Sequence, residues 1–112
     1  MKKITIVVFP VTGEAEIKEI SDDLYTMQEL VGGGYVEAVY HEGYTLWCNE
    51  DGMSKGFPLN RFVGPHAILG NFFVSKDDDE GDMVSLTSED VEEVKRLFAK
   101  DALKDIDSLK LL

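Results

Sequence analysis

The chain has 112 residues, which is close to the commonest size of one domain. It carries 22 acidic and 11 basic side chains, and the resulting charge of −11 repels nucleic acids, membrane surfaces and other polyanions. These numbers argue against direct nucleic-acid or membrane binding and favour a basic partner. The single cysteine, Cys48, cannot form an intrachain disulfide, so nothing indicates an oxidising compartment.

The start of the chain predicts a β-hairpin. Residues 3–9 are rich in β-branched side chains and apolar on both faces, which is typical of a central strand. This run ends at Pro10 with no small-residue cleavage site after it, so we expect a strand and not a signal peptide. Residues 15–20 alternate between apolar and charged side chains and predict the second strand.

A helix and two more strands are expected next. Ser21 is the predicted N-cap, with Asp22 and Asp23 complementing the helix dipole in the first turn. Apolar residues at helical spacing form one face, and three glycines at 32–34 end the helix. That face consists of Leu24, Met27, Leu30 and Val31. Two strands at 35–40 and 44–49 follow, and then a hairpin-type turn at 50–52.

The C-terminal half predicts a long loop, two short strands and a helix. Pro58, Gly64 and Pro65 interrupt residues 56–70, which we expect to be irregular. Strands at 71–75 and 83–86 flank an acidic tip at 77–82. Thr87 is the predicted N-cap of the last helix, and Asp90 completes a capping box. The apolar face of this helix consists of Val91, Val94, Leu97 and Phe98.

This order of elements predicts a small single α+β domain, with a mainly antiparallel sheet and two helices packed on it. We expect residues 1–100 to form the domain and residues 101–112 to form a C-terminal helical extension or a tail. No stretch reaches the ~18–20 apolar residues of a membrane span, so we expect a soluble, cytoplasmic protein.

The sequence offers no catalytic or metal-binding set. The glycines at 32–34 lack the Lys-Ser/Thr of a phosphate-binding loop, and the run 77–82 lacks carboxylates at both ends of an EF-hand register. His41, Cys48 and His66 match no zinc spacing and suggest no nucleophile–base pair. We therefore expect a non-enzymatic protein without a metal or another cofactor.

One window of the chain, residues 52–75, contains no Asp or Glu. Its candidate ligand contacts are Lys55, Arg61 and His66. In the loop 55–66, Pro58 lowers the entropy lost when the loop orders, Arg61 offers planar donors for phosphate, and Asn60 offers a donor and an acceptor. The structural alternative is that Arg61 pairs with one of the many carboxylates and Asn60 caps a turn.

Several stretches resemble the motifs of a known family. Residues 24–37 resemble L-x-x-L-Q-x-x-V-G-G-Y-I-E, and residues 48–61 resemble C-N-E-x-G-x-x-x-G-L-P-x-N-R. Residues 69–74 and 80–87 match its later elements, so the resemblance covers about residues 4–98. The chain departs from the pattern in an extra glycine at 32–34, in Phe57 where Leu is usual, and in its C-terminal tail.

This resemblance is to a small family of unknown function, carried mainly by phages, prophages and plasmids. It implies a mobile-element accessory protein in a bacterial cytoplasm, and it supplies no activity. It also marks four residues as part of the shared pattern: Asn49, Pro58, Asn60 and Arg61.

Two functional hypotheses follow. The first is a non-enzymatic phage or mobile-element protein that counters host defence by sequestering an anionic, nucleotide-derived small molecule. Arg61 would hold its phosphate and Asn60 its ribose or base, while Trp47, Phe57 or Tyr35 would stack on the base. The predicted ligand-binding residues are Tyr35, Trp47, Asn49, Lys55, Phe57, Pro58, Asn60, Arg61 and His66.

The second hypothesis is an acidic DNA mimic that inhibits a basic, nucleic-acid-binding host defence protein. Its contact surface would be the acidic residues of 77–82 and 89–93. For the first hypothesis, the apolar residues Leu109, Leu111 and Leu112 predict a contact between copies in a homo-oligomer, and a frayed tail is the alternative.

Overall fold

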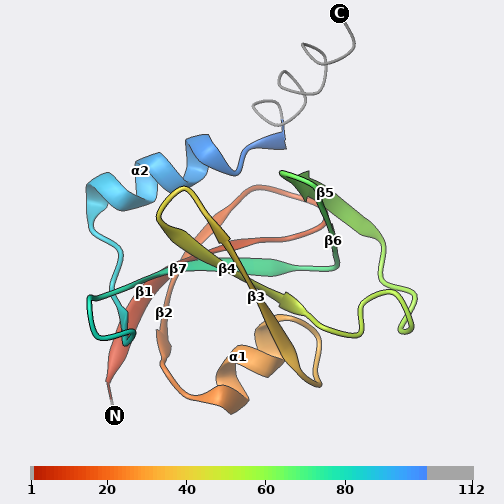
Figure 1. Ribbon diagram of the computed structural model, residues 1–112, viewed down its shortest axis with the longest axis horizontal. Coiled ribbons are helices and arrows are strands. Elements are labelled where there is room, and N and C mark those ends of the chain that lie inside the picture. The colour runs from red at the N-terminus through yellow and green to blue at the C-terminus, as the bar shows by residue number, and fades with distance from the viewer. Residues whose placement is uncertain (1, 101–112) are drawn as a thin grey trace, which may run out of the picture.

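An antiparallel sheet forms the centre of the molecule, with strand order β2-β1-β7-β4-β3 and a short further strand, β8, paired with β7 (Figure 1). The structure is a computed structural model and describes residues 2–100. The strands are Lys3–Phe9 (β1), Glu16–Ser21 (β2), Val36–His41 (β3), Tyr44–Asn49 (β4), Phe72–Asp77 (β7) and Met83–Val84 (β8). Every pairing is antiparallel, which confirms the predicted α+β class.

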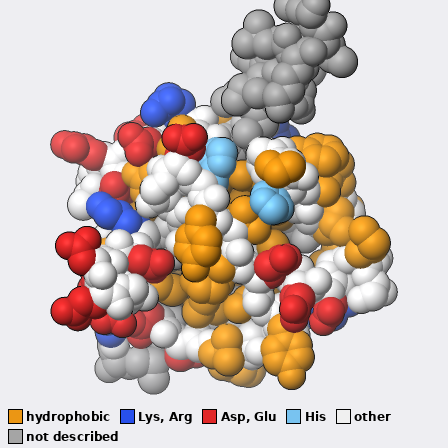
Figure 2. All heavy atoms as spheres, viewed as in Figure 1, with side chains coloured by type: hydrophobic (Ala, Val, Ile, Leu, Met, Phe, Trp, Pro, Cys, Tyr) orange, Lys and Arg blue, Asp and Glu red, His pale blue; other side chains and the backbone are white. Residues whose placement is uncertain are grey.

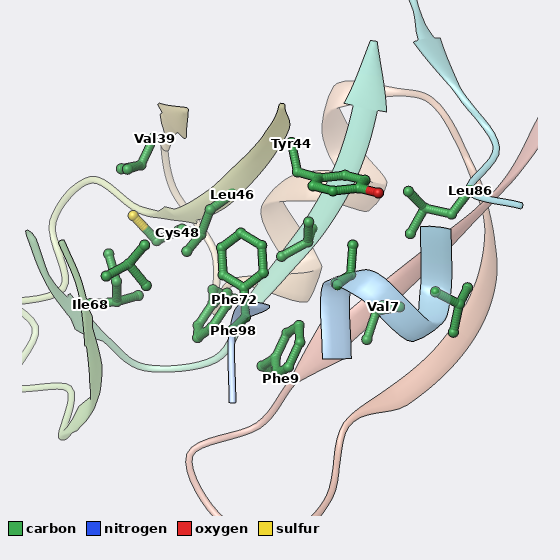
Figure 3. Close-up of a cluster of buried hydrophobic side chains, with 14 residues drawn as sticks. Val7, Phe9, Val39, Tyr44, Leu46, Cys48, Ile68, Phe72, Leu86 and Phe98 are labelled. Atoms are coloured by element: carbon green, nitrogen blue, oxygen red, sulfur yellow. The ribbon is translucent and has the colours of Figure 1, made fainter. Parts of the chain in front are cut away.

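The central strands are buried on both faces because their side chains alternate between two hydrophobic clusters. In β1, Val7 and Phe9 point into the larger cluster, while Ile4, Ile6 and Val8 point into the smaller one. Figure 3 shows the larger cluster, in which the rings of Phe9 and Phe72 stack with centroids 5.0 Å apart. The β-branched residues and double-sided apolar pattern at 3–9 therefore predicted a central strand correctly.

Helix α1, Leu24–Leu30, packs on the smaller cluster through Met27. Its N-cap is Asp23, whose carboxylate accepts a hydrogen bond from the Thr26 N–H at 2.9 Å. The predicted cap at Ser21 is wrong because the β1–β2 ladder extends to Ser21. Leu24, expected on the apolar face, is 58% exposed. The glycines at 32–34 follow the helix as predicted, all with positive φ of 87–95°.

Helix α2, Ser88–Leu97, covers the opposite face of the sheet. The capping box is present, because the Thr87 side chain accepts from the Asp90 N–H and the Asp90 carboxylate accepts from the Thr87 N–H. Val91, Val94 and Phe98 are buried in the larger cluster, as the periodicity predicted.

A β-hairpin occupies the segment 56–70, which was expected to be irregular. Its strands are β5, Leu59–Val63, and β6, His66–Leu69, joined by a turn at residues 64–65. The prediction failed because a bulge near Asn60 breaks the register and buries a polar side chain, which hides the alternation of a strand. Val63 and Ile68 pack the hairpin onto the larger cluster.

Residues 50–52 do not close a hairpin, contrary to the prediction, because β4 pairs with β3 and β7 and not with the next strand. The expected C-terminal extension at 101–112, with Leu109, Leu111 and Leu112, lies outside the described residues. Within residues 2–100, no helix is long and apolar enough to cross a membrane.

Candidate functional site

The chain between β4 and β5, residues 50–58, folds into consecutive turns that are ordered by their own backbone. The N–H groups of Lys55, Gly56 and Phe57 donate to the carbonyls of Asp51, Met53 and Gly52, in that order, at 2.9–3.1 Å. These turns present Lys55 and Phe57 to the glycine segment that follows α1. Two sequence motifs far apart in the chain therefore meet here.

The ring of Phe57 lies between two glycines. A Cβ added at Gly32 would lie 2.9 Å from Phe57 Cζ, and a Cβ added at Gly70 would lie 2.8 Å from Phe57 Cδ2. Both glycines also have positive φ, 95° and 81°. Neither position accepts a side chain without moving the aromatic ring or straining the backbone. The contact joins the turns 50–58 to the end of α1 and to the start of β7.

The carbonyl oxygen of Gly33 accepts hydrogen bonds from two side chains of the other motif segment. Asn49 Nδ2 and Lys55 Nζ each donate to it at 2.6 Å. Asn49 also donates to the Val31 carbonyl at 3.0 Å and accepts from the Asp51 N–H at 2.9 Å, so all of its polar atoms are used. Asn49 is thus a structural residue, whereas the exposed Lys55 keeps two N–H donors beyond the one used on Gly33.

A cavity of about 260 Å³ opens beside Phe57. It is mainly apolar and is lined by Val11, Val31, Gly32, Phe57, Pro58, Gly70 and Asn71. The Lys55 ammonium lies 5.9 Å from the centroid of the Phe57 ring, which is one wall of the cavity. Because drug-sized ligands occupy ~300–1,000 Å³, this cavity suits one flat ring and not a whole nucleotide.

Asn60 has no polar atom available for a ligand. It is 5% exposed, and its Nδ2 donates to the carbonyls of Phe9 and Gly70 at 2.9 and 3.0 Å. Its Oδ1 accepts from Arg61 Nε at 2.9 Å. Asn60 was expected to contact a ribose or a base. In the structure, its hydrogen bonds instead connect β5 to β1 and to the start of β7.

Arg61 likewise takes a structural position. Its guanidinium carbon lies 5.0 Å from the centroid of the Phe9 ring and 5.3 Å from that of Phe72, and Nη1 donates to the carbonyl of Phe98. Phe98 is the C-cap of α2, where a cation is favoured by the helix dipole. Burial lowers the pKa of Arg61 from its usual value. Arg61 thus fastens the β5–β6 hairpin to α2, and it forms no ion pair with a carboxylate among residues 2–100.

The remaining predicted site residues are dispersed. Trp47 lies on the α1 face, where its Nε1 donates to Ser75 Oγ at 2.8 Å, and His66 lies at the turn of the hairpin, at the opposite end of β5 from Pro58. The Tyr35 carbonyl accepts a hydrogen bond from the Glu50 N–H at 3.0 Å, which places Tyr35 beside the turns 50–58. The residue is 69% exposed. The structure brings together Asn49, Lys55, Phe57 and Pro58, with Tyr35 at the border.

A second polar cluster lies where α2 meets β4. Tyr44 Oη is 3.0 Å from both Asp90 Oδ1 and Glu93 Oε1, and Lys76 Nζ is 3.2 Å from Asp90 Oδ2. Burial, followed by the hydrogen bonds with Glu93 and Asp90, raises the pKa of Tyr44 well above its ordinary value. Burial alone would raise the pKa of Asp90, but hydrogen bonds from Thr87, Tyr44 and Lys76 outweigh it and lower that pKa.

Cys48 is not arranged as a nucleophile. Burial, and then the nearby Glu37 carboxylate, raises its pKa to about 11, so the thiol stays protonated at neutral pH. Among residues 2–100, no three or more His, Cys, Asp or Glu side chains are grouped to hold a metal ion. In the same part of the chain, every buried side-chain nitrogen or oxygen has a hydrogen-bond partner. Recognition at the cavity would therefore use apolar contact, backbone groups and Lys55.

The segments that meet at Phe57 and Gly33 are also those that resemble a known family. A family model described as "Domain of unknown function (DUF3846)" matches residues 1–99. The chain belongs to this family. No curated protein and no solved structure shows significant similarity to it. The predicted membership of a small family of unknown function is thus confirmed, and the segments 24–37 and 48–61 meet at one site.

Neither the cavity nor the contribution of Val11, Val31, Gly70 and Asn71 to it is predicted by the sequence. The available signal was a pair of glycines, Gly32 and Gly70, within the segments 24–37 and 69–74. The sequence predicted that Gly32 follows the end of a helix, and the structure places it there, directly after the C-cap of α1. Its second role, close approach to Phe57, depends on tertiary contacts that the sequence does not display.

Proposed function

We propose that this DUF3846 chain is a non-enzymatic binding protein that captures an anionic, nucleotide-derived small molecule at the cavity beside Phe57. One observation carries the proposal: Phe57 lines a largely apolar cavity of about 260 Å³, and the Lys55 ammonium lies 5.9 Å from the centroid of the same ring. An apolar hollow next to a cation suits a ligand with a flat ring and a negatively charged group.

The cavity accounts for the ring of such a ligand. A base would lie against Phe57 and Pro58, where Gly32 and Gly70 allow close approach of the backbone. Stacking of a base on an aromatic side chain is worth about 1–3 kcal/mol. Because the cavity holds about one ring, the sugar and phosphate would remain outside it.

Lys55 accounts for the negative charge. Its ammonium is fixed on the Gly33 carbonyl and still has free donors, so it takes the role that the sequence analysis gave to Arg61. A lysine acts on phosphate as a point charge, which tolerates several phosphate geometries. Sequestration of a signal requires affinity and no catalysis, which fits the absence of a nucleophile–base pair in the sequence. The resemblance to phage, prophage and plasmid proteins supports an anti-defence role for such sequestration.

Thermal unfolding with a panel of mono-, di- and cyclic nucleotides tests the proposal. A ligand at about 100 times its dissociation constant adds about 2.7 kcal/mol to the folded state. We expect one compound to raise the melting temperature of the wild type and of Lys18→Gln, which removes one exposed charge on β2, and to raise that of Lys55→Gln much less. No shift with any compound, or equal shifts in both variants, would contradict it.

A second candidate, the acidic inhibitor of a basic host protein, is favoured by the order of the β7–β8 turn. Asp78 Oδ1 accepts from the N–H groups of Glu80 and Asp82 at 2.9 and 3.0 Å, so the acidic tip is preformed. Figure 2 shows acidic side chains gathered at the left, over this turn and the start of α2. This candidate predicts that the affinity for the basic partner falls with added salt and in the Asp79→Asn/Glu80→Gln variant. The Lys55→Gln substitution should leave that affinity unchanged.

A further inference from the structure

The outer edge of β3 presents backbone groups that no other described strand uses. β3 pairs only with β4 among the strands of residues 2–100, and it lies at the end of the sheet order. The two-residue turn Glu42-Gly43, with φ of 52° and 86°, makes His41 and Tyr44 a hydrogen-bonded pair. Alternation then directs the N–H and C=O groups of Ala38 and Tyr40 away from β4, toward the free edge.

The two edges of the sheet differ in how they are protected. On β2, the exposed charged residues Glu16, Lys18 and Glu19 discourage pairing with another strand, in the manner common to edge strands. β3 instead carries one charged side chain, Glu37, and ends near the 76% exposed Tyr40. In the view of Figure 1, β3 lies at the front, and Figure 2 shows hydrophobic side chains over it with acidic side chains next to them.

A small cavity beside this edge adds a charge preference. It measures about 170 Å³, and its lining includes Glu37, Glu50, Met53 and Ala67. Glu37 and Glu50 take part in none of the ion pairs formed by the described residues. A side chain from an added strand, opposite Glu37 and on the same face, would stand about 5 Å from it. A Lys or Arg there could lay its aliphatic stem along Met53 and its charge between the two carboxylates.

We propose that the edge of β3 binds an extended, basic segment of a partner protein by strand addition, with a Lys or Arg side chain received between Glu37 and Glu50. Main-chain hydrogen bonds to Ala38 and Tyr40 would supply affinity, and the cavity would supply specificity. A second copy of this chain is disfavoured as the occupant, because each copy carries a charge of −11. This surface is separate from the cavity beside Phe57 and does not depend on that function.

The test uses the full chain and a synthetic eight-residue peptide that alternates Lys with Val, with a Glu–Val peptide as its control. We expect the Lys–Val peptide to protect the amides of Ala38 and Tyr40 from hydrogen exchange, as followed by NMR. Ala38→Pro removes an outward donor and leaves the bonds to β4 in place, so it should abolish binding. Glu37→Gln/Glu50→Gln should weaken binding about tenfold.

The matched control is Glu89→Gln/Glu92→Gln, which removes the same charge from exposed positions of α2 and should leave the affinity within about twofold. Equal losses in both double variants would show non-specific attraction and overturn the proposal. Absence of protection at Ala38 and Tyr40 at millimolar peptide would overturn it as well. So would a dimer of the chain alone, seen by sedimentation, that Ala38→Pro dissociates, since the edge would then serve a second copy.

Discussion

Phe57 and Gly32 touch so closely that a Cβ on Gly32 would lie 2.9 Å from the end of the Phe57 ring. The two residues belong to different sequence motifs, 24–37 and 48–61, and lie 25 positions apart in the chain. Their contact closes the turns 50–58 onto the end of α1 and forms one wall of the cavity. The site therefore depends on the absence of a side chain at Gly32.

Gly32→Ala should destabilise the protein more than Gly33→Ala. Both positions have positive φ, so alanine at either costs about 1 kcal/mol of unfolding free energy. Only Gly32 also meets the Phe57 ring, whereas a Cβ at Gly33 has nothing within 4 Å, so overpacking should add about 1–2 kcal/mol at Gly32. Urea unfolding measures both values. Equal losses would show that the Phe57 contact has no energetic weight.

Phe57→Leu should relieve the clash that Gly32→Ala creates. Leu lacks the ring atoms nearest Gly32. In a double-mutant cycle, we expect the pair to be less destabilising than the sum of the single changes by about 1 kcal/mol. Strict additivity would mean that the two residues are not coupled.

Asn60→Asp should be among the most disruptive small changes in the chain. It replaces a buried donor by a carboxylate that faces the carbonyl oxygens of Phe9 and Gly70. Buried groups left unsatisfied cost about 1–3 kcal/mol, so we expect a loss near the upper end at pH 7. Burial raises the pKa of the new carboxyl, so the folded state of the variant binds a proton at a higher pH than the unfolded state does. Part of the lost unfolding free energy should therefore be recovered as the pH falls. A loss that does not change with pH would contradict this account.

Arg61→Lys should lower stability without changing ligand affinity in the folded protein. Lysine cannot reproduce the stacking over Phe9 and Phe72 together with the bond to the Phe98 carbonyl, so we expect a loss of about 1–2 kcal/mol. Arg96→Lys, at a guanidinium that is 70% exposed, is the control and should be near neutral. A folded Arg61→Lys protein with weakened ligand binding would restore the phosphate role expected from the sequence.

Tyr44→Phe should change the response to alkaline pH. The pKa of Tyr44 is raised in the folded state, so its contribution is fully present below the unfolded value of about 10 and is lost as the pH rises above it. The wild type should therefore lose stability above pH ~10 more steeply than Tyr44→Phe. Tyr40→Phe, at a 76% exposed ring, should retain the wild-type slope. Parallel urea-unfolding curves for all three proteins would contradict the prediction.

The sequence predicted those elements whose apolar pattern faces the core directly. The double-sided run of β1 and the 3.6-residue spacing of Val91, Val94 and Phe98 both correspond to buried positions. The β5–β6 hairpin was missed because Asn60 is a buried polar residue whose partners, the carbonyls of Phe9 and Gly70, come from elsewhere in the chain. Local pattern does not show such a partner.

At the candidate site, the sequence and the structure agree on some of the residues, and ligand binding there stays a prediction. Phe57 and Pro58, from the acid-free window, line one cavity, and the Lys55 ammonium lies 5.9 Å from the centroid of the Phe57 ring. Asn60 and Arg61 resembled ligand contacts because their side chains are rich in donors, yet those donors are used within the fold. Which donors remain free depends on tertiary contacts, and Val11 and Asn71 complete the cavity from a turn and a strand edge that no local motif marks.

The most direct test of the central claim is an NMR titration of the ¹⁵N-labelled chain with the nucleotide panel. The account predicts that a binding nucleotide shifts the backbone amides around the cavity, at Val11, Gly32, Phe57 and Gly70, and that Lys55→Gln weakens these shifts. The turn at 77–82 and the β3 edge should stay unchanged. Shifts centred on either of those surfaces, or no shift with any nucleotide, would contradict a ligand site beside Phe57.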